Sequence, residues 1–254
     1  MPDSTGSVAV ITGASAGIGA ALARELVARG SRVVLSARTA ETLHVVAASL
    51  GAAAHAVPAD VTRRADVERI RDAAIATFGG IDVWVNNAGR GIARPVLELT
   101  DEDVDEMITV NVKSALYGMQ VAVPYFMAKG RGHLINVSSF LGRVPLASPR
   151  SAYSAAKAAL NSLTANLRMD LAASHPEVHV SLVMPGVVTT GFAQNARGSQ
   201  GPLATPPPGG VMQPQTPEQV AAMIADVIDR PVPELFTNPA SPGLAAQYYR
   251  VGQS

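Results

Sequence analysis

The chain has 254 residues, of which 48% are hydrophobic and 16% are charged, so it can bury an ordinary core and is not a disordered chain. Twenty Lys and Arg balance twenty Asp and Glu without any basic run, which argues against a nucleic-acid partner. The absence of cysteine excludes disulfides, thiolate metal sites and cysteine nucleophiles.

The first residues, MPDSTGSVAVITG, contain no basic segment followed by a long apolar one, and no stretch of the sequence approaches the length that spans a membrane. From this pattern we expect a cytoplasmic protein that makes no membrane contact.

Short apolar segments with strand character alternate with longer segments whose apolar residues recur at helical spacing. The expected strands are 7–12, 32–36, 53–57, 81–85, 133–138, 178–184 and 234–237. The expected helices are 18–29, a second one ended by Gly51, a third from an N-cap at Thr62 to Gly79, a long one at 100–128, then 152–174 and 216–228, with a tail at the end. The last of these helices is expected to start with a capping box, TPEQ at 216–219. This alternation predicts an α/β fold with one doubly wound parallel sheet, a Rossmann fold, and helices on both faces.

One segment departs from this alternation. From Gly198 to Gln215, nine of eighteen residues are Gly or Pro, a composition that neither helix nor strand tolerates. The segment is a surface linker or a lid over a substrate, and its place just after the sixth strand favours a lid. We therefore expect a single domain over residues 1–254, with a substrate lid at about 191–215.

A glycine-rich turn, TGASAGIG at 12–19, joins the first strand to the first helix. Glycines at such a turn let a phosphate approach the free amides of the helix N-terminus. The same letters spell G-x-S-x-G, the nucleophile elbow of a serine hydrolase with Ser15 as nucleophile. This alternative is disfavoured, because His175 ends a helix, His179 lies within a strand, and no earlier loop could complete an oxyanion hole.

Three further motifs follow other predicted strands: NNAG at 86–89, YSAAK at 153–157 and PGVVTT at 185–190. All four motifs lie at the carboxyl ends of strands, the edge at which open parallel sheets bind ligands. On these motifs, in this order, the chain resembles the classical short-chain dehydrogenase/reductase family over essentially its full length.

Tyr153 and Lys157 are four residues apart and so share one face of a helix. A tyrosine ionises near pKa ~10, and a neighbouring ammonium lowers that value. The resemblance implies that Tyr153 protonates a carbonyl oxygen in reduction or deprotonates an alcohol in oxidation. It also implies that Lys157 tunes the tyrosine and holds the nicotinamide ribose.

Two more catalytic residues come from the resemblance. Ser139, which precedes FLG, would bind the substrate oxygen, with Ser138 as a competitor because Ser139 lies fourteen residues before Tyr153, one more than the commonest family spacing. Asn111, within VNV, would position a water that relays protons to Lys157. From the sequence alone, a helical polar residue satisfied by backbone groups is the stronger interpretation of Asn111.

The cofactor preference is predicted from the end of the second strand. Relatives that prefer NAD carry an acidic residue where this chain has Ala37, and Arg38 follows it. A guanidinium binds a 2′-phosphate well, so we predict NADP(H) in preference to NAD(H), with Ser15 and Thr39 as extra donors. The alternative is a solvated arginine.

The resemblance implies further cofactor contacts at the adenine, through Asp60 and Val61, and at the nicotinamide, through Val188 and Thr190. The complete implied cofactor set is Gly13, Ser15, Gly17, Ile18, Gly19, Arg38, Asp60, Val61, Asn87, Gly89, Tyr153, Lys157, Pro185, Gly186, Val188 and Thr190. The five histidines show no ligand spacing, so we expect no catalytic metal.

Together these features predict an NADPH-dependent carbonyl reductase or alcohol dehydrogenase that moves a hydride between nicotinamide and a small-molecule ketone, aldehyde or secondary alcohol. A largely apolar substrate is expected from Phe140, Leu141, Val144 and Phe192, while Arg94, Arg143 and Arg150 are expected to be solvated. The alternative is a non-catalytic NADP-binding sensor. The resemblance also implies a homotetramer, or failing that a dimer.

Overall fold

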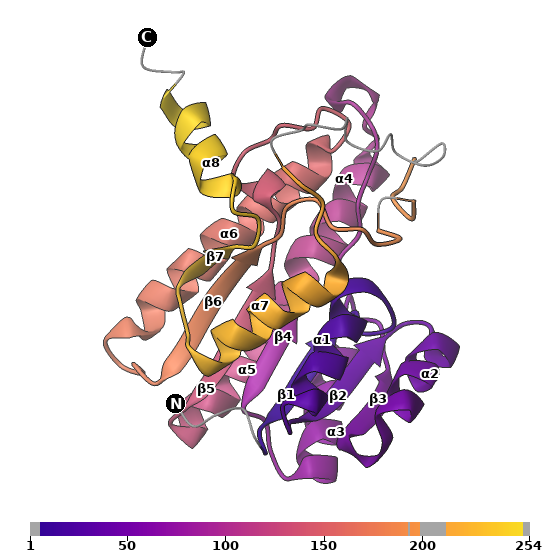
Figure 1. Ribbon diagram of the computed structural model, residues 1–254, viewed down its shortest axis with the longest axis vertical. Coiled ribbons are helices and arrows are strands. Elements are labelled where there is room, and N and C mark those ends of the chain that lie inside the picture. Colours follow the sequence, from indigo (N-terminus) through magenta and orange to yellow (C-terminus); the bar gives the residue numbers. More distant parts are fainter. Residues whose placement is uncertain (1–5, 193, 199–211, 251–254) are drawn as a thin grey trace.

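The computed structural model describes residues 6–192, 194–198 and 212–250. Within them, one parallel sheet has the strand order β3-β2-β1-β4-β5-β6-β7 (Figure 1). The strands are β1 Val8–Thr12, β2 Arg32–Ala37, β3 Ala54–Pro58, β4 Val83–Asn86, β5 Gly132–Val137, β6 Val178–Met184 and β7 Glu234–Phe236. The predicted doubly wound α/β fold is confirmed.

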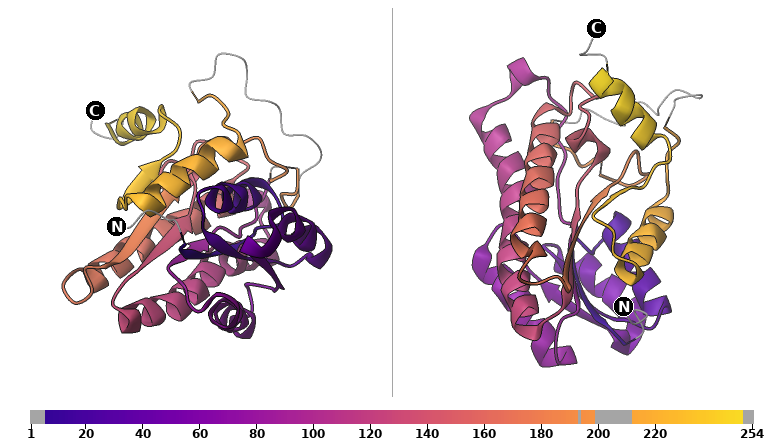
Figure 2. Two further views of the ribbon diagram at one scale, coloured as in Figure 1. Left: turned by 60° about the horizontal axis from the view of Figure 1, so that its bottom comes forward. Right: turned by 90° about the vertical axis from the view of Figure 1, so that its left-hand side faces the viewer.

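The helices form a layer on each side of the sheet (Figure 2). Their bounds are α1 Gly17–Ala28, α2 Ala40–Leu50, α3 Arg64–Phe78, α4 Asp101–Ile108, α5 Ser114–Lys129, α6 Ser151–Ala172, α7 Pro217–Asp229 and α8 Ser241–Arg250. One core cluster joins the sheet to α1, α2 and α7, and a second joins its other face to α3, α5 and α6. Because both faces are covered, β1 and β4 are buried along their whole length, as their apolar sequences require.

The direction of winding reverses between β1 and β4. Val10 of β1 pairs with Val34 of β2 on one side and with Trp84 of β4 on the other. The crevice at such a reversal is where doubly wound sheets bind ligands. The glycine-rich turn after β1 and the NNAG motif after β4 therefore meet at the expected place.

The long helix expected over 100–128 is present, with one turn of different geometry within it. It ends as α4 at Ile108, passes through a π-helical turn at Thr109–Lys113, and resumes as α5 at Ser114. Such turns interrupt α-helices often at functional sites. Nothing in the sequence indicated this π-helical turn, because such a turn barely changes the apolar pattern. The turn contains Asn111.

Two expectations about helices are corrected. Thr62 does not cap α3: its hydroxyl donates to the Asp60 carboxylate at 2.8 Å, and Arg63 takes the N-cap position. The residues expected as a tail form α8, in which Ala245 packs with Phe140 and Val144. This tertiary packing stabilises a ten-residue helix whose own sequence signals it weakly.

The capping box predicted at the start of α7 is confirmed, since Thr216 and Gln219 exchange bonds between side chain and backbone. The predicted lid at 191–215 lies largely in residues 193 and 199–211, outside the described part of the chain. None of the helices in the described ranges is long and apolar enough to cross a membrane.

Candidate active site

The glycine-rich turn is packed directly against the segment that follows β4. Gly13 and Gly17 adopt φ values of +67° and +54°, a region that side chains disfavour. A Cβ added at Gly13 would lie 2.8 Å from Cα of Ala88, and one added at Gly19 would lie 2.4 Å from the Gly13 carbonyl oxygen. The turn therefore tolerates no side chain at Gly13 or Gly19. It also presents the free amides of the α1 N-terminus, which can bind a phosphate.

Asn87 holds this turn in place from the neighbouring strand end. Its amide nitrogen donates to the carbonyl oxygens of Thr12 at 2.9 Å and Gly13 at 3.2 Å. The Thr12 hydroxyl in turn accepts from the backbone N–H groups of Asn87 and Ala88 at 3.0 and 3.1 Å. Asn87 thus holds the backbone of the turn in its conformation. Thr12 also holds the turn against the segment after β4, a role that its sequence did not indicate.

Tyr153 and Lys157 lie side by side on α6, with only 7% and 3% of their surfaces exposed. The Lys157 ammonium donates to the carbonyl oxygen of Val137 at 2.9 Å and lies 5.8 Å from the centre of the Tyr153 ring. Burial lowers the pKa of Lys157 to about 8. One of its three N–H groups is used by Val137, so others remain for a ligand.

Burial raises the pKa of Tyr153 to about 12, although a hydrogen bond with Ser139 and the charge of Arg150 oppose the rise. The expectation that Lys157 holds this pKa below its usual value is therefore not met by the protein chain alone. Desolvation of the phenolate outweighs the nearby charges. At neutral pH the phenol keeps its proton, which suits a proton donor.

The two candidate serines have different surroundings. The Ser138 hydroxyl donates to the Asn161 side chain at 2.5 Å and lies 3.3 Å from the Lys157 carbonyl oxygen, so its bonding is internal. The Ser139 hydroxyl accepts from the Leu141 amide at 3.2 Å and lies close enough to the Tyr153 phenol to lower its pKa. The geometry therefore favours Ser139 over Ser138 as the residue that meets a substrate oxygen.

Asn111 is 1% exposed within the π-helical turn and its side chain is bonded to backbone groups. Its amide nitrogen donates to the carbonyl oxygens of Arg90 at 2.9 Å and Met107 at 3.1 Å, and its oxygen accepts from the Arg90 amide at 3.1 Å. Gly89 separates it from Lys157, since a Cβ there would lie 2.9 Å from the Asn111 oxygen and 3.5 Å from the Lys157 nitrogen. The position of Asn111 is thus consistent both with a polar residue satisfied by backbone groups and with a residue that positions a water near Lys157.

The residues expected near the adenine end lie at the ends of β2 and β3, which pair through Ala37 and Pro58. Arg38 is exposed, and its side chain has no hydrogen-bonding partner among the described residues. The Asp60 carboxylate accepts from the amide and the hydroxyl of Thr62 at 3.0 and 2.8 Å. Arg38 is therefore available for an anion, whereas one oxygen of Asp60 is already occupied.

The PGVVTT motif after β6 lies against the glycine-rich turn. A Cβ added at Gly17 would lie 3.3 Å from the Thr190 methyl group. The Pro185 carbonyl oxygen accepts from the Phe140 amide at 2.8 Å, and the Thr190 hydroxyl accepts from the Phe192 amide at 3.3 Å. The structure thus brings this motif together with the glycine turn and with the segment that carries the candidate residue Ser139.

Of the four expected substrate residues, two lie near Tyr153. The Phe192 ring is centred 5.5 Å from the Tyr153 ring, and Leu141 packs in the same apolar cluster as Tyr153. Phe140 and Val144 are 2% and 0% exposed and pack with Ala245 of α8. For these two the expectation is corrected: they belong to a small core that α8 covers.

The three arginines expected to be solvated are all engaged. Arg150 is only 9% exposed and donates to the Ile92 carbonyl oxygen at 3.0 Å. Arg94 pairs with Asp103 at 2.8 Å, and Arg143 pairs with Glu234. Carboxylates therefore neutralise Arg94 and Arg143, whereas Arg150 is buried with a backbone carbonyl oxygen as its partner.

The geometry gives no support to the serine hydrolase alternative. His133 and His179 lie near the amino ends of β5 and β6, at the sheet edge opposite Ser15, with their rings 5.9 Å apart. His133 bonds to the Ser181 hydroxyl at 2.8 Å. Among the described residues, no group of His, Cys, Asp or Glu is arranged to hold a metal ion.

Comparisons with known proteins agree with this site. The profile of the family described as short chain dehydrogenase matches residues 7–201. An uncharacterized oxidoreductase of Staphylococcus epidermidis is 38% identical over 183 residues, which are 72% of this chain and 78% of that protein.

Two solved structures are similar over almost the whole chain. A short-chain dehydrogenase/reductase from Burkholderia phymatum, in complex with NAD, has a TM-score of 0.89 and 28% identity, and the match covers 100% of this chain and 96% of that one. The closed form of a serine dehydrogenase with NADP+ has a TM-score of 0.83 and 30% identity, with 92% and 95% covered. By its sequence, its parallel sheet and these relatives, the chain belongs to the short-chain dehydrogenase family and is an oxidoreductase.

Proposed function

We propose that this oxidoreductase is an NADPH-dependent carbonyl reductase that also runs as an alcohol dehydrogenase, acting on a neutral, largely apolar ketone, aldehyde or secondary alcohol. The observation that carries the proposal is the pairing of a buried, protonated Tyr153 with Lys157 and Ser139 at the carboxyl edge of the sheet. A buried phenol with a raised pKa holds the proton that a reduced carbonyl oxygen needs.

In this mechanism each residue acts at a stated atom. The Ser139 hydroxyl donates a hydrogen bond to the carbonyl oxygen, and the Tyr153 hydroxyl gives that oxygen its proton as negative charge develops there. The Lys157 ammonium, positioned by the Val137 carbonyl oxygen, stabilises the tyrosinate that remains. When bound, a nicotinamide cofactor supplies the hydride.

The residues present fit such a cofactor. The glycine-rich turn and the start of α1 would hold its phosphates, and Lys157 and the Thr190 region would hold its nicotinamide end. The preference for NADPH rests on Arg38, which is exposed and lacks a partner in the described chain, and on Ala37, where a carboxylate would repel a 2′-phosphate. Similar structures contain either NAD or NADP, so the proposed preference rests on these two residues of the chain.

A neutral substrate is proposed from the side chains around Tyr153. Arg94 and Arg143 are bound to carboxylates, and Arg150 is buried and donates to a backbone carbonyl group, so none of the three is an exposed, unpaired cation. Phe192 and Leu141 offer apolar surface beside the phenol. Desolvating a charged substrate group here without a partner would be costly.

The assembly and location remain part of the proposal. We propose a homotetramer, with a dimer as the second candidate, formed in the cytoplasm from a chain that is one domain with a substrate lid. Met127 of α5 and Met169 of α6 are exposed by 37% and 67%, as helices that pair between subunits would require. Light scattering at micromolar concentration measures the assembly, and a monomer would contradict it.

The first test measures initial rates of NADPH and NADH oxidation with a panel of neutral ketones, aldehydes and keto acids, together with the melting temperature with each cofactor. The proposal expects turnover of neutral carbonyl compounds and faster rates with NADPH. Stabilisation by NADPH without turnover would favour the alternative function, a non-catalytic sensor. Best rates with keto acids would overturn the substrate class.

A further inference from the structure

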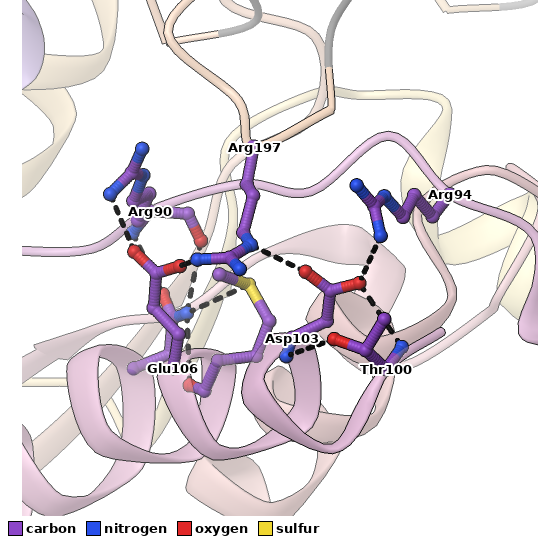
Figure 3. A network of polar contacts seen from close by, with 8 residues as sticks. Arg90, Arg94, Thr100, Asp103, Glu106 and Arg197 are labelled. Carbon is purple, nitrogen blue, oxygen red and sulfur yellow. Dashed lines mark hydrogen bonds and ion pairs between the residues drawn. The ribbon is translucent and has the colours of Figure 1, made fainter. Parts of the chain in front are cut away.

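A network of ion pairs connects α4 to two loops beside the active site. We call it the α4 network; its members are Arg90, Arg94, Asp103, Glu106 and Arg197 (Figure 3). Neither motif resemblance nor periodicity singles these residues out. They come from the loop after β4, from α4, and from the segment after β6.

Arg197 is the member that joins the two carboxylates. Its Nε donates to one oxygen of Asp103, and its Nη1 donates to Glu106 at 2.6 Å. The second oxygen of Asp103 accepts from Arg94 at 2.8 Å, and the second oxygen of Glu106 accepts from Arg90. Arg197 thus binds with both edges of its guanidinium, in a geometry that a lysine cannot reproduce.

Asp103 is the buried centre of the network, with a side chain that is 0% exposed. Burial alone would raise its pKa, but the Thr100 amide and the Arg197 and Arg94 guanidiniums hold that pKa below its usual value. The carboxylate is therefore charged at neutral pH. A buried charge of this kind requires partners in fixed positions.

The backbone of Arg197 is also hydrogen-bonded to the loop after β4. Its N–H donates to the Gly91 carbonyl oxygen at 2.9 Å, and its own carbonyl oxygen accepts from the Ala93 amide at 2.8 Å. Five residues earlier in the same segment, Phe192 lies against Tyr153. A Cβ at Gly91 would lie 2.9 Å from the Phe192 ring, so the loop after β4 also contacts this ring.

We propose that Arg197 is a positioning residue that determines substrate specificity: by bridging Asp103 and Glu106, it fixes the segment after β6 so that Phe192 forms a wall beside Tyr153. The inference rests on the proposed carbonyl reduction, whose substrate this wall would orient and whose size it would limit. Arg197 contacts neither Tyr153 nor the glycine turn, so its effect passes through Phe192.

Arg197→Ala is a clean test because it leaves no buried charge alone. Asp103 keeps Arg94 and Glu106 keeps Arg90, so the variant is expected to fold. Arg90→Ala is the matched control, since it removes one ion pair of the same Glu106 but leaves both contacts of Arg197. Arg197→Lys keeps the positive charge but cannot bridge Asp103 and Glu106. This variant replaces Arg197→Ala in the test if the alanine variant fails to fold.

The first readout does not depend on turnover. In a Phe192→Trp background, acrylamide quenching reports on position 192, because the natural tryptophan, Trp84, is fully buried. We expect Arg197→Ala to raise the quenching constant at least about twofold and Arg90→Ala to leave it unchanged. An equal quenching constant in both variants would overturn the inference.

The second readout is kinetic. For a small ketone, Arg197→Ala is expected to raise KM at least about tenfold with a smaller change in kcat, while the ratio of kcat/KM for a bulky over a small ketone rises by a similar factor. Arg90→Ala should keep that ratio. An unchanged ratio in Arg197→Ala would refute the role of Arg197 in specificity. No turnover in any variant would refute the proposed function instead. The quenching result would then decide by itself whether Arg197 anchors the segment after β6.

Discussion

The two sides of the candidate active site are held together by different means. On the cofactor side, glycines of the turn after β1 pack against the segment after β4. A Cβ added at Gly13 would lie 2.8 Å from Cα of Ala88, and one added at Gly19 would lie 2.6 Å from the Asn87 side chain. On the substrate side, the segment after β6 is held by Arg197, whose partners Asp103 and Glu106 lie more than ninety residues earlier. The first arrangement admits one residue type at each contact, whereas the second depends on charged side chains that other pairs could replace.

We infer from this contrast that the cofactor side performs a task common to the family, the binding of the cofactor phosphates. The substrate side performs a task particular to this chain, the selection of its substrate. A turn that must approach a phosphate needs the absence of side chains. A wall that selects a substrate needs side chains of a particular size and position. Substitutions on the two sides should therefore affect different kinetic quantities.

The largest effect is expected where the two sides meet, at Tyr153. Tyr153→Phe removes the proton donor and keeps the ring that packs against Phe192. General acid catalysis contributes roughly 10²- to 10⁴-fold, so kcat should fall by about that factor. Stopped or steady-state rates measure the loss, and the dissociation constant of NADPH, which should stay within about twofold, is the control. Retention of most activity would show that another group donates the proton.

Cofactor choice is expected to change next most strongly, and only on the cofactor side. Ala37→Asp combined with Arg38→Ala removes the cation and adds a carboxylate for a ribose diol. A charge-assisted contact is worth roughly 1.5 to 3 kcal/mol, so the NADPH over NADH ratio of kcat/KM should fall about tenfold to a hundredfold. The ratio for bulky over small ketones should stay constant. An unchanged cofactor ratio would refute the NADP preference.

A smaller effect, on both affinity and stability, is expected at Gly19. The Cβ of Gly19→Ala would lie 2.4 Å from the Gly13 carbonyl oxygen, so the turn must shift. Overpacking of this kind costs about 1 to 3 kcal/mol and should weaken NADPH binding roughly tenfold. Gly243→Ala is the matched control, since its Cβ meets nothing within 4 Å. Urea unfolding and cofactor titration measure both quantities, and equal behaviour of the two variants would contradict the close packing of the turn.

The smallest effect at neutral pH is expected far from both sides, at the amino edge of the sheet. Burial and the charge of His179 lower the pKa of His133 to about 3, against about 6.5 in an unfolded chain. Between these pH values only the unfolded chain binds the proton. The contribution of neutral His133 to the free energy of unfolding is therefore complete above about pH 6.5 and is lost as the pH falls toward 3. The loss is at most about 1.4 kcal/mol per pH unit.

His133→Gln removes this titration and keeps a group able to bond with Ser181. Its free energy of unfolding should fall less than that of the parent between pH 7 and pH 5, as measured by urea titration. The NADPH over NADH ratio should be equal in the two proteins, because His133 lies at the opposite edge from the cofactor side. Parallel pH profiles of stability would show that His133 does not titrate as its burial predicts.

Most of the fold could be predicted from the sequence because it depends on local signals. Apolar runs of strand length, glycines at helix ends and the capping box at Thr216 each report on a few neighbouring residues, and the structure confirms the strands they predict. The π-helical turn around Asn111 was missed because an inserted residue barely changes an apolar pattern. Helix α8 was missed because packing on Phe140 and Val144, distant in sequence, stabilises it.

The candidate site divides in the same way. The sequence by itself determined the glycine turn, the Tyr153 and Lys157 pair and their place at the carboxyl edge, since motif spacing and strand order fix all three. Tertiary structure alone decided the choice of Ser139 over Ser138, the burial that raises the pKa of Tyr153, and the bridge from Arg197 to α4. Hydrogen-bond partners, desolvation and ion pairs depend on which distant residues meet, and a linear sequence carries no direct record of that.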